Sequence, residues 1–231
     1  MSTVLVTGAN RGIGLEFARQ YAAGGWRVIA CCRHQAKAAD LKLLADGSDG
    51  RVSVHALDVT DHKAVDALAR ELKKESLDLL INNAGTYGPD DQSIGKMDYA
   101  GWAETMAVNV MAPLKMTQAF LGQLEKGQQK KIVAMSSIMG SIRDSPPVGN
   151  YVYRSSKAAL NMTVRSLSID LRARNLITLA MHPGWVRTRM GGEGAPLAPE
   201  QSVTSMRRVI AGLTMADSGA FLDYQGRPLA W

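Results

Sequence analysis

Cysteine is almost absent from this sequence. Its 231 residues include only two, Cys31 and Cys32, which are neighbours in an apolar run. Adjacent cysteines cannot join separate loops, so a scaffold held together by disulfides is excluded. The start of the chain also lacks the basic, apolar and small-residue regions of a signal peptide. Both absences favour a reducing compartment, and we expect a cytoplasmic protein.

Long hydrophobic runs and blocks of like charge are missing as well. No apolar stretch is long enough to cross a bilayer, so we expect no membrane partner. The formal net charge of +6 comes from scattered basic residues, without the aromatic-interleaved basic block of a nucleic-acid-binding surface. We therefore expect anionic small molecules rather than nucleic acid as ligands, and we predict no metal site.

What is present is a chain of ordinary globular composition, 46% hydrophobic and 21% charged. Its length suits a single domain over residues 1–231, because hydrophobic cores grow to roughly 250 residues before they divide. Apolar runs typical of buried strands alternate with amphipathic stretches typical of helices. This pattern predicts an α/β fold with a doubly wound, mainly parallel, seven-stranded sheet and helices on both faces. The last two strands are expected at 175–181 and 221–222.

A glycine-rich turn follows the first predicted strand, Thr3 to Thr7, and leads into an amphipathic stretch. Glycines let the backbone turn tightly and approach a ligand, while the free amides at the start of the next helix attract phosphate. The turn therefore predicts a dinucleotide pyrophosphate site, with an ordinary strand-to-helix turn as the alternative. The predicted contacts are Gly8, Asn10, Arg11, Gly12, Ile13 and Gly14.

The end of the second predicted strand indicates which dinucleotide binds. An acidic residue there is typical of NAD-binding sequences, because it hydrogen-bonds the ribose. Here the strand ends in Cys31 and Cys32 and is followed by Arg33, whose planar cation suits a 2′-phosphate. Arg11 adds a second positive charge. We predict NADP(H), with NAD(H) as the alternative.

The third and fourth predicted strands end in polar residues. Asp58 follows the third strand, where its carboxylate can accept from an adenine amine, although a turn or capping role is the alternative. Thr60 or Asp61 is expected to cap the next helix. The fourth strand, 77–81, runs into Asn82-Asn83-Ala84-Gly85, where small residues allow a close approach and asparagines can pair with exposed backbone groups.

A long helix is predicted from about Trp102 to Gln123, with Asn109 in its middle and a bend at Pro113. Proline lacks the N–H that would otherwise bond the carbonyl of Asn109. That carbonyl oxygen is therefore free to hold a water molecule.

A proton donor with its activator is predicted on the helix after residue 150. Tyr153 and Lys157 are four residues apart and share one helical face. A neighbouring positive charge lowers the pKa of a phenol and makes it a better acid near neutral pH. The fifth predicted strand, 131–135, brings Ser136 and Ser137 to the same edge of the sheet. The spacing alone is weak evidence, because a solvated helix face can carry it.

Together these features resemble the short-chain dehydrogenase/reductase family, classical type. Three motifs stand in family order: Thr7 to Gly14 resembles the cofactor motif, Asn82 to Gly85 the strand-four motif, and Tyr153 with Lys157 the catalytic motif. The resemblance covers the whole length and implies a Rossmann-type fold. More narrowly, residues 136–143, 153–161, 182–192 and 226–231 resemble the C-factor/sniffer-like carbonyl reductases.

The resemblance implies a catalytic tetrad of Asn109, Ser137, Tyr153 and Lys157. Ser137 is chosen over Ser136 because the family usually uses the second serine; the loop from it to Tyr153 is longer than typical, around 144–147. The resemblance divides the chain into a cofactor half, about 1–130, and a catalytic and substrate half, about 131–231. It also implies cofactor contacts by Tyr153, Lys157, Asp58, Val59, Asn83, Ala84, Gly85, Pro183, Gly184, Val186 and Thr188.

The implied activity is the NADPH-dependent interconversion of an aldehyde or ketone with an alcohol by hydride transfer. Tyr153 would be the acid, Ser137 would hold the carbonyl oxygen, and Lys157 would lower the pKa of Tyr153 and hold a ribose hydroxyl. Asn109 would fix a water. The alternative is a dinucleotide-binding signalling or redox-sensing protein of the C-factor type with little turnover. A homo-oligomer, dimer or tetramer, is expected, with a monomer as the alternative.

Overall fold

One parallel sheet forms the centre of the protein. The structure is a computed structural model that describes residues 1–144 and 149–231. Its seven strands follow the order β3-β2-β1-β4-β5-β6-β7, and every neighbouring pair is parallel. The predicted α/β class is confirmed, with a wholly parallel sheet. The strands are β1 (Thr3–Thr7), β2 (Arg27–Cys32), β3 (Val52–Ala56), β4 (Leu79–Asn82), β5 (Lys131–Met135), β6 (Ile177–His182) and β7 (Ala220–Asp223).

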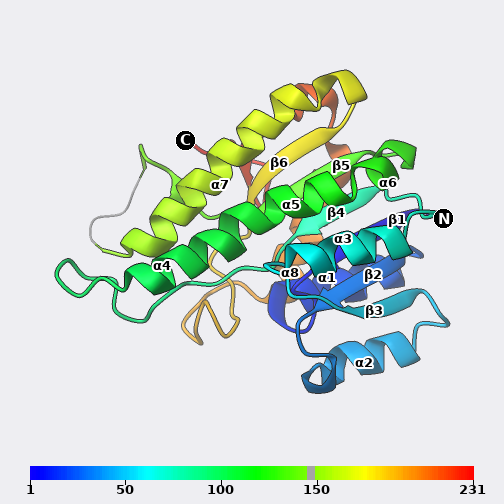
Figure 1. The fold of residues 1–231 in the computed structure, drawn as a ribbon, viewed down its shortest axis with the longest axis horizontal. Coiled ribbons are helices and arrows are strands. Elements are labelled where there is room, and N and C mark those ends of the chain that lie inside the picture. The colour runs from blue at the N-terminus through cyan, green and yellow to red at the C-terminus, as the bar shows by residue number, and fades with distance from the viewer. Residues whose placement is uncertain (145–148) are drawn as a thin grey trace.

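Helices cover both faces of this sheet (Figure 1). Alternate strand residues point to opposite faces, so Val4 and Val6 of β1 pack with α1, α2 and α8, while Leu5 packs with α3, α5 and α6. Burial on both faces explains why the strands read as continuous apolar runs. The helices are α1 (Gly12–Ala23), α2 (Ala39–Asp46), α3 (His62–Glu71), α4 (Tyr99–Met106), α5 (Ala112–Ala119), α6 (Leu121–Lys126), α7 (Tyr151–Asp170) and α8 (Pro199–Gly212).

The predicted helix from Trp102 to Gln123 is not continuous, which corrects the sequence interpretation. A π-helical segment, Ala107–Met111, separates α4 from α5, and α6 follows as a further short helix. Pro113 is the second residue of α5, one residue beyond the π-helical segment, and its missing N–H removes a regular helical hydrogen bond. π-Helical turns are frequent at functional sites, and this one contains Asn109.

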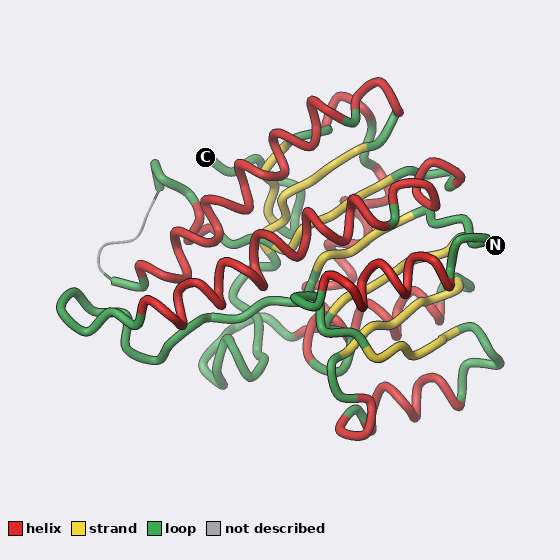
Figure 2. The backbone as a smooth tube through the Cα atoms, viewed as in Figure 1, coloured by secondary structure: helices red, strands yellow, loops and turns green. Residues whose placement is uncertain are grey.

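The loops that follow β1, β4, β5 and β6 emerge from the carboxyl edge of the sheet (Figure 2). The strand order changes direction between β1 and β4, and ligands of open α/β sheets bind at such a switch point. Residues 145–147 of the predicted longer loop lie outside the described part of the chain. Among the described residues, no helix is both long and apolar enough to cross a membrane.

Candidate active site

The glycine turn is packed against the loop after β4. Gly8 has a φ of +66°, and a Cβ on it would lie 2.9 Å from the Cα of Ala84. A Cβ on Gly14 would lie 2.3 Å from the carbonyl oxygen of Gly8 and 2.4 Å from Nδ2 of Asn83. Any side chain at Gly14 therefore collides with the turn, because real Cβ contacts are never this short. The turn requires glycine at both positions.

Thr7 and Asn83 hold the two loops together. Oγ1 of Thr7 accepts from the amides of Asn83 and Ala84, both at 3.0 Å. Nδ2 of Asn83 donates to the carbonyls of Thr7 at 2.9 Å and Gly8 at 3.2 Å. The prediction that asparagine pairs with exposed backbone groups is confirmed at Asn83. Thr7 was not singled out from the sequence, although its place at the end of β1 is a usable signal.

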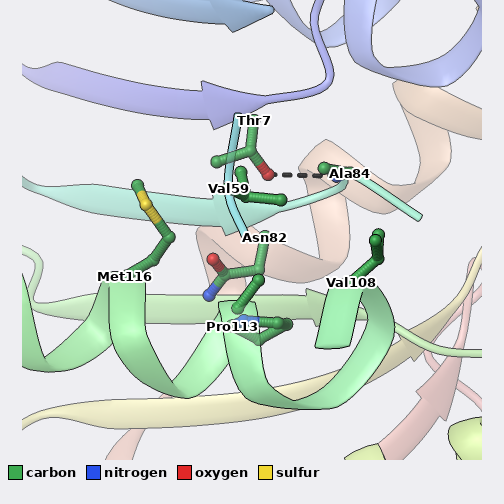
Figure 3. A pocket seen from close by; sticks show the side chains of 8 residues that line it. Thr7, Val59, Asn82, Ala84, Val108, Pro113 and Met116 are labelled. Atoms are coloured by element: carbon green, nitrogen blue, oxygen red, sulfur yellow. Dashed lines mark hydrogen bonds between the residues drawn. The ribbon is translucent and has the colours of Figure 1, made fainter. Parts of the chain in front are cut away.

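Asn82 behaves differently from its neighbour. Its side chain is 4% exposed, and neither its Nδ2 nor its Oδ1 has a hydrogen-bond partner among the described residues. Figure 3 shows it facing Pro113 and Met116 of α5 across a small pocket. The pocket also borders the loops after β1, β3 and β4, and its lining is Thr7, Val59, Asn82, Ala84, Val108, Ala112, Pro113 and Met116.

Asp58 serves the turn after β3. Its Oδ1 accepts from the amide of Thr60 at 2.9 Å and from the Thr60 hydroxyl at 2.7 Å. Partial burial acts to raise the pKa of Asp58, but these hydrogen bonds and the nearby charges of Arg33 and His34 lower it overall. Arg33 is exposed beside this turn. Of the two predicted caps, it is Asp61 that caps α3, through the amides of Lys63 and Ala64.

The two serines after β5 have separate partners. Oγ of Ser136 donates to Oδ1 of Asn161 on α7 at 2.6 Å. Ser137 instead accepts from the amide of Met139 at 3.2 Å, and its hydroxyl lies near enough to the phenol to lower the pKa of Tyr153. The structure therefore brings Ser137, the serine chosen from the sequence, to Tyr153. The longer loop between them does not separate them.

Lys157 lies on α7 one turn after Tyr153 and is buried, with 5% of its surface exposed. Its Nζ donates to the carbonyl of Met135 at 2.8 Å and lies 5.6 Å from the centre of the Tyr153 ring. Burial lowers the pKa of Lys157 to about 8. A Cβ on Gly85 would lie 3.8 Å from this Nζ, so the loop after β4 also reaches the cluster.

The side chain of Asn109, in the π-helical segment, joins the loop after β4 to α7. Its Oδ1 accepts from the amide of Thr86 at 2.9 Å, and its Nδ2 donates to the Thr86 carbonyl and to Oγ of Ser156, both at 2.9 Å. Ser156 in turn donates to the carbonyl of Tyr153 at 2.7 Å. These hydrogen bonds connect Asn109 through Ser156 to Tyr153, and so place it beside another member of the predicted tetrad. The role predicted for its main-chain carbonyl stays a prediction.

Tyr153 departs from the sequence interpretation in its pKa. Burial raises the pKa of Tyr153 to about 12, the hydrogen bond with Ser137 opposes that rise, and the neighbouring Tyr87 adds to it. Burial is the largest influence on the pKa of this phenol, and the lowering expected from Lys157 does not accompany it. The rings of Tyr87 and Tyr153 stack with centres 4.6 Å apart and planes at 26°. The sequence analysis missed Tyr87, although its position just after Gly85 at the carboxyl edge could have indicated it.

The loop after β6 closes the other side of the site. Gly12 has a φ of +53°, and a Cβ on it would lie 3.3 Å from Cγ2 of Thr188, so this loop touches the glycine turn. Oγ of Ser202 donates a hydrogen bond to the carbonyl of Pro183 at 2.6 Å. Gly184 has a φ of +84° and packs against Leu197 and Tyr224. Across the described residues, no group of three His, Cys, Asp or Glu side chains could hold a metal ion.

A family model described as short chain dehydrogenase matches residues 2–196, and the chain belongs to this family of oxidoreductases. Within it, the predicted resemblance to C-factor/sniffer-like carbonyl reductases is confirmed. The carbonyl reductase Sniffer of D. melanogaster superimposes with a TM-score of 0.94 at 32% identity over 100% of both chains. A carbonyl reductase from chicken fatty liver, solved with NADPH bound, gives a TM-score of 0.92 at 38% identity, covering 100% of this chain and 99% of that one.

C-signal of Myxococcus xanthus is a further relative. It is 45% identical over 165 residues, which make up 99% of C-signal but 71% of this chain. Part of this chain therefore has no counterpart in that match.

Proposed function

We propose that the protein reduces an aldehyde or ketone to an alcohol with NADPH. The observation that carries this proposal is the buried cluster in which Ser137 and Tyr153 lie together while Nζ of Lys157 lies 5.6 Å from the centre of the Tyr153 ring. The cluster stands beside a turn shaped for a dinucleotide. The similarity to a carbonyl reductase with NADPH bound supports the choice of reaction and cofactor.

The residues present fit a dinucleotide with a phosphate on its ribose. Gly8 and Gly14 leave no room for a Cβ, and the α1 N-cap residue, Arg11, makes no side-chain cap. The first amides of α1 are thus available to a pyrophosphate. Arg33 would hold the 2′-phosphate. The other proposed contacts are Asn10, Gly12, Ile13, Asp58, Val59, Asn83, Ala84, Gly85, Tyr153, Lys157, Pro183, Gly184, Val186 and Thr188.

The bound NADPH would supply the hydride, and the chain's own residues would handle the oxygen and its proton. Ser137 would donate a hydrogen bond to the carbonyl oxygen, where negative charge develops, and Tyr153 would transfer its phenolic proton to that oxygen. The raised pKa of Tyr153 keeps this proton in place near neutral pH. Lys157 would hold a ribose hydroxyl and stabilise the phenolate that follows. The Asn109 carbonyl would hold a water that returns the proton.

Arg33→Ala should weaken NADPH binding by about 10- to 100-fold, because a charge-assisted hydrogen bond contributes about 1.5–3 kcal/mol. NADH carries no 2′-phosphate, so its dissociation constant should stay within about twofold. Fluorescence titrations with NADPH and with NADH measure the two dissociation constants and the ratio between them. Arg172→Ala, an exposed arginine after α7, is the matched control and should change neither value. Equal losses for NADPH and NADH in Arg33→Ala would contradict the assignment.

The rate of carbonyl reduction should fall as pH rises through about 8, the pKa to which burial lowers Lys157. Below that pH Lys157 is charged and can hold the ribose; above it the charge is lost. Tyr153, with a pKa of about 12, still carries its proton over this range. The dependence of kcat/KM for NADPH on pH, which reports groups of the free enzyme, measures the effect. A flat profile between about pH 7 and 10 would contradict the role of Lys157.

The similarity to C-signal favours a second candidate, a dinucleotide-binding signalling or redox-sensing protein with little turnover. An assembled tetrad argues against pure sensing, because a sensor has no need for a proton donor and a proton path. A broad panel of aldehydes and ketones, followed by NADPH oxidation, separates the two. NADPH binding without turnover on the whole panel would favour the sensor.

We also propose that the protein is a homo-oligomer. Large apolar side chains are exposed on and beside the helices around Asn109 and Tyr153, namely Met111, Met162 and Ile169. Such exposure suits association with a second copy. Sedimentation of the purified protein measures its mass, and a monomer at high concentration would contradict the proposal.

A further inference from the structure

Gln92 is a buried glutamine in the loop between β4 and α4, with 4% of its surface exposed. Its Nε2 donates to the carbonyls of Tyr87 at 2.9 Å and Pro89 at 3.0 Å. Its Oε1 accepts from the main-chain amide of Tyr153 at 3.1 Å. The partners fix the orientation of the side-chain amide, because the carbonyls can only accept and the amide can only donate. One side chain therefore ties this loop to Tyr153 itself.

Within the described residues, no side chain near the start of α7 forms a cap that could replace this bond. Asn150, the N-cap residue, has a φ of 57° and makes no side-chain capping hydrogen bond. The first regular helical bond runs from the amide of Arg154 to the carbonyl of Asn150, so the amide of Tyr153 is left without a helical partner. N-cap side chains usually satisfy this third amide of a helix. Here a residue 61 positions away in the sequence does so.

The same loop brings an aromatic ring against the phenol. Gln92 holds the carbonyl of Tyr87, whose ring stacks on Tyr153 with centres 4.6 Å apart. The intervening Gly88 has a φ of +91°, and a Cβ on it would lie 2.8 Å from Oγ1 of Thr105 on α4 and 2.9 Å from Cγ1 of Val152 on α7. The loop between β4 and α4 therefore packs closely against both α4 and α7 at Gly88. Main chain and ring of Tyr153 are both held from this side.

We infer that Gln92 is a positioning residue for Tyr153: through its two donated bonds and one accepted bond it fixes the start of α7 and stacks Tyr87 on the phenol. The inference rests on the proposed role of Tyr153 as the acid. Proton transfer requires the phenol within hydrogen-bond reach of the carbonyl oxygen, and a misplacement of about 1 Å can lower a rate 100-fold. NADPH binding has other anchors, so it should not depend on Gln92.

Gln92→Leu tests the inference, because leucine fills similar space and makes none of the three bonds. We expect kcat to fall about 10- to 100-fold while the NADPH dissociation constant stays within about twofold. The matched control is Gln123→Leu, another buried glutamine, whose Nε2 donates to the carbonyl of Ala69 at 2.8 Å away from the site. It should lower the melting temperature and leave kcat unchanged. Equal kcat in the two variants overturns the inference.

Tyr87→Leu gives a second test that holds even if Gln92→Leu fails to fold. It removes the stacked ring, and we expect kcat to fall with NADPH binding retained; an unchanged kcat overturns the inference. If both variants fold, their effects on kcat should be less than additive in the double variant, because both act through Tyr153. Fully additive losses in kcat would show that Gln92 and Tyr87 act independently, which contradicts the inference.

The proposed function has its own separate test. Ordinary activity in Tyr153→Phe refutes the proposed function. Inactivity of that variant, together with normal kcat in Gln92→Leu, refutes only the inference about Gln92.

Discussion

Tyr153→Phe should lower the rate of carbonyl reduction by about 100- to 10,000-fold, the range that a positioned general acid contributes. Phenylalanine keeps the ring that stacks on Tyr87 and loses only the hydroxyl, which lies near Ser137. NADPH should therefore still bind, and the fold should be retained. Steady-state reduction of an accepted carbonyl substrate and a fluorescence titration of NADPH measure the two effects separately.

The matched control for this variant is Tyr151→Phe, which removes a hydroxyl from a half-exposed tyrosine two residues earlier on α7. Its turnover should equal that of the unaltered protein. Retention of ordinary turnover in Tyr153→Phe would remove Tyr153 from the role of acid.

Gly14→Ala should abolish measurable NADPH binding and lower the free energy of unfolding by about 1–3 kcal/mol, the usual cost of overpacking. The added methyl group would lie 2.3 Å from the Gly8 carbonyl and 2.4 Å from Nδ2 of Asn83, so the turn or the loop after β4 must move. Either movement spoils the approach of the backbone to a pyrophosphate. Urea unfolding and the NADPH titration measure both effects.

Gly122→Ala is the control for that substitution. Gly122 is also a helical glycine, and nothing lies within 4 Å of a Cβ built on it. Alanine favours the helix by about 0.8–1.0 kcal/mol over glycine, so this variant should be more stable and bind NADPH normally. If the two alanine variants unfold and bind alike, the close packing of the turn is not what requires glycine at position 14.

The strand pattern was readable from the sequence because burial on both sheet faces makes each strand a short apolar run. The run at 131–135 is the strand β5 of the structure, and β4 and β6 begin slightly later than predicted. The limits of a helix could not be predicted where the helix propensity of the segment and its packing in the fold favour different structures. The division of the predicted helix at 102–123 shows this: its π-helical segment contains Asn109, whose side chain bonds to the distant residues Thr86 and Ser156.

The sequence predicted those parts of the candidate site whose residues lie close together along the chain. The glycine turn, the Asn82 to Gly85 motif and the Tyr153/Lys157 pair are each short segments with a local physical meaning. The choice between Ser136 and Ser137 did not follow from local chemistry: it came from the family resemblance, and in the structure Ser136 bonds to Asn161 while Ser137 lies beside Tyr153. The pKa of Tyr153 also could not be read, because it depends on burial by segments distant in sequence.

The sequence by itself therefore determined the fold class, the edge of the sheet at which the candidate site lies and most residues proposed for that site. The fold class and the glycine turn follow from period, glycine spacing and side-chain chemistry, which act over a few residues, and the tetrad and several cofactor contacts follow from the family resemblance. Only the tertiary structure decided which side chains hold Tyr153 in place. Gln92 caps α7 and Tyr87 stacks on the phenol because folding brings the loop after β4 to the start of a helix some sixty residues later. No local pattern encodes a contact between such distant segments.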